Sequence, residues 1–124
     1  MASGRESGKP VVLDSEQRPW GAWHVIDVAK GYKIKRIHVT PGARLSLQSH
    51  EHRSEHWVVI QGEATCEVDG VESLVRHGES IDVALGARHR LGNRGTVELV
   101  VVEIQLGPYT GEDGICRYED DYGR

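Results

Sequence analysis

The sequence has 124 residues, a length typical of one domain. Its 15 Lys and Arg residues against 19 Asp and Glu residues give a net charge of -4, which argues against nucleic acid as a partner. No apolar run approaches the ~18 residues of a membrane span, and the first residues lack an apolar secretory core. We therefore expect a cytoplasmic protein that binds neither nucleic acid nor membranes.

The chain begins with a polar segment rich in Gly and Ser, and we expect residues 1–17 to form a mobile arm before a domain at residues 18–124. Within that domain, short runs rich in β-branched and aromatic residues alternate with turns that contain Gly. We predict strands at residues 23–28, 32–39, 43–49, 55–60, 63–68, 71–76, 79–85, 89–91 and 97–106.

No segment of the sequence predicts a helix, and the acidic tail at residues 107–124 is predicted to be irregular. The dipeptide Asp69-Gly70 lies between two predicted strands, and Asp-Gly is the strongest short signal for a β-hairpin. Many short strands separated by Gly turns indicate an all-β sandwich or barrel.

A polar face is predicted on the strand that leads to His50. Residues of equal parity share a face of a strand, so Arg44, Gln48 and His50 are expected to point one way. Leu45 and Leu47 point the other way. A polar strand face inside a small protein is unusual. We therefore expect this face to line a cavity that contains a reactive site.

The spacing around His50 resembles the first motif of the cupin superfamily. The motif is matched at Gly42, Gln48, His50, Glu55 and Gly62. The one departure is Gln48, which stands where the superfamily has its first histidine. The resemblance implies a jelly-roll β-barrel, also called a double-stranded β-helix, with one metal ion inside.

A second stretch resembles the second cupin motif. It is matched at Gly78, Ala84, Gly86, His89 and Asn93. The one departure is alanine in place of proline at position 84. Two long motifs in the expected order are a far stronger signal than a single pair of histidines.

Residues 18–124 carry a more specific resemblance. The stretches RPWGAW, KIKRIHVTPGARLSLQSHEHRSEHWVVIQGEA, GARHRLGN and VEIQLGPYTGEDGICRYEDDYGR resemble the C-terminal domain of type II phosphomannose isomerases. In that family the domain usually follows a mannose-1-phosphate guanylyltransferase domain, for which 124 residues leave no room. The sequence also has EDGICR where the family tends to have a second acid before the Ile. The resemblance implies interconversion of mannose 6-phosphate and fructose 6-phosphate.

The resemblance assigns the metal ligands as Gln48, His50, Glu55 and His89. A rival set consists of His50, His52 and His56 with Glu55, and a third interpretation is a hydrogen-bonded polar core without metal. Choosing Gln48 keeps the spacing of the superfamily, whereas choosing His52 breaks it. Nitrogen and oxygen ligands suit one divalent ion, for which we expect zinc first and manganese, iron, cobalt or nickel as alternatives.

The implied reaction opens the sugar ring and moves a proton between C2 and C1 through an enediolate. It needs a cation for the developing oxyanion, a base, and positive side chains for the phosphate. Lys33 and Lys35 share a strand face that is either solvated or part of the cavity, and the resemblance favours Lys35 as base or enediolate partner. Glu103 lies either near the metal or in a structural salt bridge.

The residues expected to be catalytic are Lys35 and Glu103, and those expected to bind substrate are Lys33, Arg44, Gln105 and Arg90. Arg90 is the weakest of these, because strict alternation turns it away from the metal side of His89.

The expected partners are a small sugar phosphate and a second copy of the chain in a homodimer. Alternative functions are another metal-dependent cupin reaction, such as oxygenation or a different sugar isomerisation, and non-catalytic sugar binding.

Overall fold

The computed structural model of the protein describes residues 11–108, 110–111 and 114–123. This part of the chain contains no α-helix, and therefore no helix long and apolar enough to cross a membrane. Its strands are β1 (Asp14–Arg18), β2 (Gly21–Ala29), β3 (Tyr32–Val39), β4 (Leu47–His50), β5 (Ser54–Gln61), β6 (Glu63–Val68), β7 (Val71–Arg76), β8 (Ser80–Val83), β9 (His89–Gly92), β10 (Leu99–Leu106) and β11 (Ile115–Glu119).

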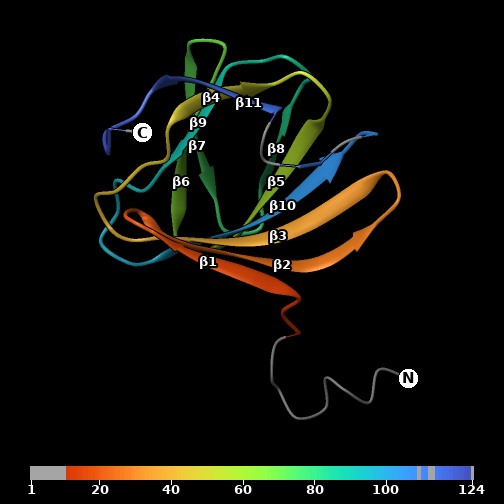
Figure 1. The fold of residues 1–124 in the computed structure, drawn as a ribbon. Helices are drawn as coiled ribbons and strands as arrows, with labels where there is room; N and C mark the ends of the chain where they lie inside the picture. Colours follow the sequence, from red (N-terminus) through yellow and green to blue (C-terminus); the bar gives the residue numbers. More distant parts are fainter. Residues whose placement is uncertain (1–10, 109, 112–113, 124) are drawn as a thin grey trace.

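The strands form two antiparallel sheets that face each other across the interior (Figure 1). One sheet has six strands in the order β1-β2-β3-β10-β5-β8, and the other has five in the order β11-β4-β9-β6-β7. Strand β10 lies between β3 and β5, which precede it by more than thirty residues. The all-β, jelly-roll architecture expected from the sequence is confirmed.

Apolar side chains from both sheets meet in the interior and form the core. On the six-stranded sheet they come from alternate positions, such as Ile37 and Val39 of β3 and Leu99 and Val101 of β10. Removal of this apolar surface from water is the main favourable term in folding. The second sheet contributes Ala64, Cys66, Val75 and Leu91.

The hairpin predicted at Asp69-Gly70 is confirmed. Strands β6 and β7 pair from Glu63 opposite Arg76 to Val68 opposite Val71. Asp69 and Gly70 have φ angles of 49° and 80°. Positive φ at both central residues is the requirement of a type I′ turn, whose twist matches that of the strands.

Two edge strands lie in segments for which no strand is predicted. Residues 14–17, assigned to the mobile arm, belong to β1, which pairs with β2; residues 1–10 of the arm lie outside the described residues. The tail predicted to be irregular contains β11, which pairs with β4. Both strands are mostly exposed. An edge strand has one unpaired side and little buried surface, so neither shows an apolar alternation.

The strand predicted at residues 43–49 is shifted in the structure, because β4 spans only Leu47–His50. Before it, Arg44 makes an isolated bridge to Gly92. The alternation that places Arg44 on the face of Gln48 and His50 therefore does not extend back to Arg44.

Candidate metal centre

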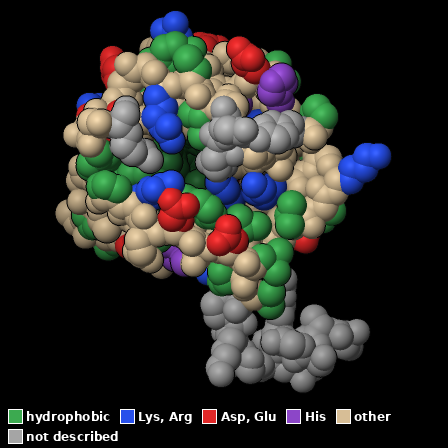
Figure 2. All heavy atoms as spheres, in the orientation of Figure 1, with side chains coloured by type: hydrophobic (Ala, Val, Ile, Leu, Met, Phe, Trp, Pro, Cys, Tyr) green, Lys and Arg blue, Asp and Glu red, His purple; other side chains and the backbone are tan. Residues whose placement is uncertain are grey.

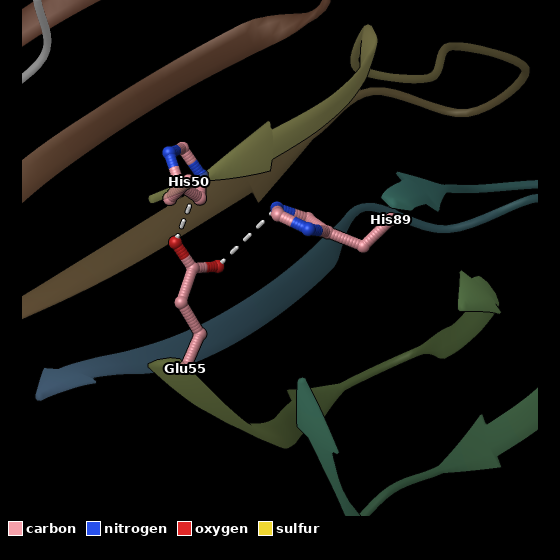
Figure 3. Close-up of side chains that lie close together, drawn as sticks. All are labelled: His50, Glu55 and His89. Atoms are coloured by element: carbon pink, nitrogen blue, oxygen red, sulfur yellow. Dashed lines mark ion pairs between the residues drawn. The ribbon is translucent and has the colours of Figure 1, made fainter. Parts of the chain in front are cut away.

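Three side chains that could bind a metal ion meet in the interior, namely His50 at the end of β4, Glu55 on β5 and His89 at the start of β9 (Figure 3). One donor atom of each lies within 4.8 Å of those of the others. His50 Nε2 is 3.2 Å from Glu55 Oε2, and His89 Nε2 is 3.7 Å from Glu55 Oε1. All three residues are buried. The structure thus brings together three of the four expected ligands.

The ring of His89 is oriented as a metal ligand requires. Its Nδ1 lies 3.0 Å from the carbonyl oxygen of Ala87. A carbonyl oxygen can only accept, so Nδ1 carries the proton and Nε2 directs its lone pair toward Glu55. Burial lowers the pKa of His89, although the charge of Glu55 opposes this shift. The neutral imidazole, which is the form that binds metals, is therefore favoured.

Glu55 is a buried carboxylate that its neighbours keep ionised. Burial alone raises its pKa, but its contacts with His50, with His89 and with the positive charge of Arg53 outweigh burial and hold the pKa well below its usual range. Trp57 Nε1 donates to Glu55 Oε1 at 3.0 Å, and Arg53 Nε donates to Glu55 Oε2 at 2.9 Å. At neutral pH the carboxylate is available as a negatively charged ligand.

Gln48, the fourth expected ligand, lies opposite His89 in the pairing of β4 with β9. Residues directly opposite each other in an antiparallel pair project from the same face of the sheet. The Nε2 atom of Gln48 donates to Ser46 Oγ at 3.0 Å, which leaves the amide oxygen available to a cation. The strand pairing thus fits the expected role of Gln48 as a metal ligand. That role stays a prediction.

Arg53 is a residue of this site that the sequence reasoning missed. It is only 4% exposed, and besides Glu55 it donates to His50 Nε2 at 3.1 Å. It also donates to the carbonyl oxygens of Thr110 and Gly111 at 3.3 and 3.4 Å. Arg53 therefore ties the ligand pair to the segment after β10. Its position two residues before Glu55, just ahead of β5, could have revealed it through the alternation expected for a strand.

The backbone beside His52 and Arg53 is packed closely enough to require a glycine in the neighbouring segment. At Gly107, which follows β10 with φ of 158°, an added Cβ atom would lie 2.2 Å from the carbonyl oxygen of His52. Only glycine permits this close approach without displacing the backbone. The end of β10 and the loop between β4 and β5 are thereby held against each other.

Glu103 of β10 lies beside the three-residue cluster. Trp57 Nε1 is 3.1 Å from Glu103 Oε2, so the indole N–H is shared between Glu103 and Glu55. Burial raises the pKa of Glu103 to about 8, the charge of Glu55 adds to the shift, and the charge of Lys35 opposes it. A carboxyl group with such a pKa can both donate and accept a proton near neutral pH.

Lys35 of β3 is directly opposite Glu103 in the pairing of β3 with β10. It is only 4% exposed, and its Nζ lies 4.1 Å from the centre of the Trp23 ring, a cation–π contact. Its neighbour Lys33 instead donates to the carbonyl oxygen of Thr110 at 2.9 Å. Of the two lysines, Lys35 is the one that faces the site.

A cleft opens beside the cluster, with an empty volume of about 480 Å³ including its open mouth. Aromatic and aliphatic side chains form part of its wall. The polar part of the wall is formed by Arg18, Lys35, Gln48, Arg53, Glu103 and Arg117. Both expected catalytic residues and the expected ligand Gln48 therefore border one space.

Two residues expected to bind substrate lie elsewhere. Arg44 makes a two-pronged ion pair with Asp121, at 2.7 and 2.9 Å. Arg90 donates to the carbonyl oxygen of Leu45 and to Glu119 Oε1, both at 3.0 Å. Both arginines border a separate hollow on the outer face of the five-stranded sheet. Neither arginine borders the cleft of Lys35 and Glu103, because one precedes the regular part of β4 and the other alternates with His89. Their expected contact with the substrate stays a prediction.

Gln105 and Lys33 also differ from expectation, since neither borders the cleft. Gln105 is fully buried, and its Nε2 donates to Glu103 Oε1 at 2.7 Å. This hydrogen bond orients Glu103, and the expected contact of Gln105 with substrate stays a prediction. Lys33 anchors the segment after β10, as described above.

The rival ligand set is not assembled. His52 is exposed, and it does not belong to the cluster of His50, Glu55 and His89. His56 alternates with Glu55 along β5, and its Nδ1 contacts Asp82 Oδ1 at 2.5 Å on the outer side of the sheet. A metal ion could not be bound by His50, His52 and His56 together in this arrangement.

Comparison with known proteins gives a match over nearly the whole chain. The family model described as "Mannose-6-phosphate isomerase C-terminal" matches residues 9–120. Xanthan biosynthesis protein XanB of Xanthomonas campestris pv. campestris (strain B100) is 48% identical over 107 residues, which cover 86% of this chain and 23% of XanB. Mannose-1-phosphate guanylyltransferase ManC of Salmonella typhimurium (strain LT2) is 47% identical over 107 residues, with coverage of 86% and 22%. The chain thus spans less than a quarter of the length of these relatives.

Among solved structures, a conserved protein with a double-stranded β-helix domain from Klebsiella pneumoniae superposes with a TM-score of 0.70. The match covers 90% of this chain and 85% of that chain at 19% identity. At this identity the likeness shows the fold alone, which is a double-stranded β-helix.

Proposed function

The chain belongs to the family of mannose-6-phosphate isomerase C-terminal domains, and we propose that it is a metal-dependent aldose–ketose isomerase acting on mannose 6-phosphate or a related sugar phosphate. The observation that carries this proposal is the meeting of His50, Glu55 and His89 beside a cleft bordered by Lys35 and Glu103. The guanylyltransferase activity in the name of ManC is not proposed here, because the chain spans only 22% of that protein.

The residues present fit a divalent metal ion. Two imidazole nitrogens and a carboxylate are the ligands that zinc and similar ions prefer, and the amide oxygen of Gln48 would complete the set. Arg53 donates to lone pairs of His50 and Glu55, so its guanidinium must withdraw from those atoms when a cation binds. When bound, such an ion acts as a Lewis acid that polarises a sugar carbonyl.

Lys35 and Glu103 supply what the proton transfer requires. Glu103, with its pKa raised to about 8 by burial, can remove a proton from one sugar carbon and return it to the neighbouring carbon. Trp57 and Gln105 donate hydrogen bonds to its two oxygens and fix its orientation. Lys35 is opposite Glu103 and places a positive charge where negative charge develops on the substrate oxygens.

The proposal is tested by a coupled assay for fructose 6-phosphate with zinc, manganese, iron, cobalt or nickel added to metal-free protein. We expect metal-dependent turnover that His89→Ala and Glu103→Gln each lower by about 100-fold or more. His56→Ala is the matched control, because this histidine belongs to the same stretch but lies on the outer side of β5. Wild-type protein that retains metal without any isomerisation would contradict the proposal, and oxygen uptake would favour an oxygenase instead.

The remaining expectations about partners are also proposals. A homodimer is expected from the sequence, and size-exclusion chromatography with light scattering measures it. A mass of one chain, 13.8 kDa, would contradict the dimer without bearing on the isomerase.

A further inference from the structure

The cleft is bordered by more positive than negative side chains. Arg18, Lys35, Arg53 and Arg117 line it, whereas Glu103 is the acidic residue of its wall. In the view towards this end of the molecule, Lys and Arg side chains gather around a central hollow (Figure 2). Water-excluding walls strengthen the attraction of such a cluster for an anion.

The four cations differ in depth and in their partners. Lys35 and Arg53 are each 4% exposed and are already engaged, one with Trp23 and Glu103, the other with Glu55. These two lie at the reacting end of the cleft. A substrate phosphate bound by Lys35 or Arg53 would occupy the space that the sugar carbon chain needs.

Arg18 and Arg117 are more exposed than Lys35 and Arg53 and are held by fewer contacts. Arg18 is 30% exposed at its side chain, and it forms an ion pair with the exposed Glu16. Arg117 is exposed, and its side chain makes no hydrogen bond or ion pair with any residue that the structure describes. An exposed ion pair such as that of Arg18 is weak, so a doubly charged anion can compete for its guanidinium. These arginines form the outer, available positive charge of the cleft.

The two arginines come from edge strands of different sheets, β1 for Arg18 and β11 for Arg117 (Figure 1). In the same cleft, Gln48 borders the space and lies opposite His89 of the metal cluster. The cleft therefore extends from an outer pair of arginines to Gln48 and Arg53, and Arg53 in turn contacts Glu55 and His50 of the metal cluster. A sugar phosphate could match this arrangement, because it has an anionic group at one end for the arginines and a carbonyl at the other end for the metal.

We propose that Arg18 and Arg117 bind the phosphate group of the substrate and so direct its carbonyl end toward His50, Glu55 and His89. This inference rests on the proposed isomerase function and names the residues that make that site select phosphorylated sugars. Guanidinium groups suit this task, because their planar N–H donors pair with phosphate oxygens in a two-pronged geometry.

The test uses the metal-loaded full chain and three variants, Arg18→Gln, Arg117→Gln and the double variant. Titration calorimetry measures binding of inorganic phosphate, mannose 6-phosphate and unphosphorylated mannose, and the isomerase assay measures kcat/KM. We expect each single variant to weaken binding of phosphate and mannose 6-phosphate by about tenfold or more, as for lost hydrogen bonds to a charged group. Binding of mannose should change by less than about twofold, because mannose makes no use of these charges.

Arg94→Gln is the matched control. Like Arg18, Arg94 is paired with a glutamate, but it is more exposed and borders the outer hollow. The control should bind all three ligands as the wild type does. Circular dichroism and thermal unfolding establish that the edge-strand variants keep the fold.

The outcomes separate the phosphate site from the isomerase. Isomerisation by the wild type together with unchanged phosphate and mannose 6-phosphate binding in the double variant overturns the phosphate site and leaves the isomerase standing. Phosphate binding that is lost in the double variant, without isomerisation in any protein, supports the phosphate site and overturns the isomerase. A wild type that neither binds phosphate nor isomerises overturns both.

Discussion

The same three neighbouring strands build an apolar region and a polar region inside the barrel. Toward one end, the inward positions of β3, β5 and β10 carry side chains such as Ile37, Val59 and Val101. At the next inward position of each strand, toward the other end of the barrel, lie Lys35, Trp57 and Glu103. Glu103 is directly opposite Lys35 on one side and Trp57 on the other. The backbone does not change between these regions, so the identity of the inward side chains alone turns a packed core into a reactive site.

The two regions differ in what they contribute. Apolar side chains in contact stabilise the fold through burial, whereas buried charges cost free energy unless they are paired and hydrogen-bonded. In the polar region each charge has such partners, including the shared indole N–H of Trp57. The apolar region therefore maintains the shape of the barrel, and the polar region uses that shape for metal and substrate binding.

The largest effect should follow from removing a ligand in the polar region. His89→Ala or Glu55→Ala should lower affinity for zinc by more than about 100-fold, a greater loss than removal of a residue that only supports a ligand. Gln48→Ala should weaken zinc binding less, because a neutral amide oxygen is the weakest of the four donors. Calorimetry on metal-free protein measures the affinities. A larger loss with His52→Ala than with Gln48→Ala would show that the ligand assignment is wrong.

The apolar region should respond in stability instead. Leu99→Ala, at a position with no exposed surface, should lower the free energy of unfolding by about 2–5 kcal/mol through lost burial and a new cavity. Urea unfolding of the metal-free protein measures this change. Leu106→Ala is the control on the same strand, because Leu106 is 49% exposed and should cost less than about 1 kcal/mol. Equal losses in the two variants would remove the distinction between these positions.

Trp57 links the two regions and should affect both measurements. Trp57→Phe keeps an aromatic ring but leaves Glu55 Oε1 and Glu103 Oε2 without their shared donor. We expect a loss of about 1–3 kcal/mol in unfolding free energy from the unsatisfied carboxylates. Zinc affinity should fall by about tenfold or more, as for loss of a group that orients a ligand. A variant with lower stability and unchanged zinc affinity would assign Trp57 to packing alone.

The smallest effect concerns an ion pair outside both regions. The hydrogen bond from Arg44 lowers the pKa of Asp121. A carboxyl group with a lowered pKa in the folded state stabilises the protein above its unfolded pKa of about 3.9, and that contribution is lost as the pH falls through the lower folded value. Asp121→Asn should therefore be slightly less stable than wild type at pH 6, and the difference should shrink below pH ~3. A difference in urea unfolding that stays constant with pH would exclude the pair as its cause.

Strands with a buried apolar side were predictable from the sequence. The predicted segments 32–39, 63–68 and 71–76 have the same bounds as β3, β6 and β7. Edge strands β1 and β11 were missed, because they bury little surface and their residues carry no alternating pattern. Since Arg18 and Arg117 lie on these strands, the outer part of the cleft was missed with them.

The metal ligands were found through spacing, whereas their surroundings depend on pairings between distant strands. Glu103 and Lys35 were recognised as charged residues in otherwise buried strands, a local feature of sequence. Arg44 was misplaced by extending a strand alternation beyond the start of β4. The contacts of Arg53 with Thr110 and Gly111 join segments more than fifty residues apart, and no local pattern specifies them.

The most direct test of the polar region is the position of a bound metal in a crystal of protein loaded with zinc or manganese. We predict one anomalous scattering peak with Gln48 Oε1, His50 Nε2, a Glu55 oxygen and His89 Nε2 at about 2.0–2.3 Å. A peak bound by His52 or His56 instead, or full metal loading with these four side chains apart, would contradict the account.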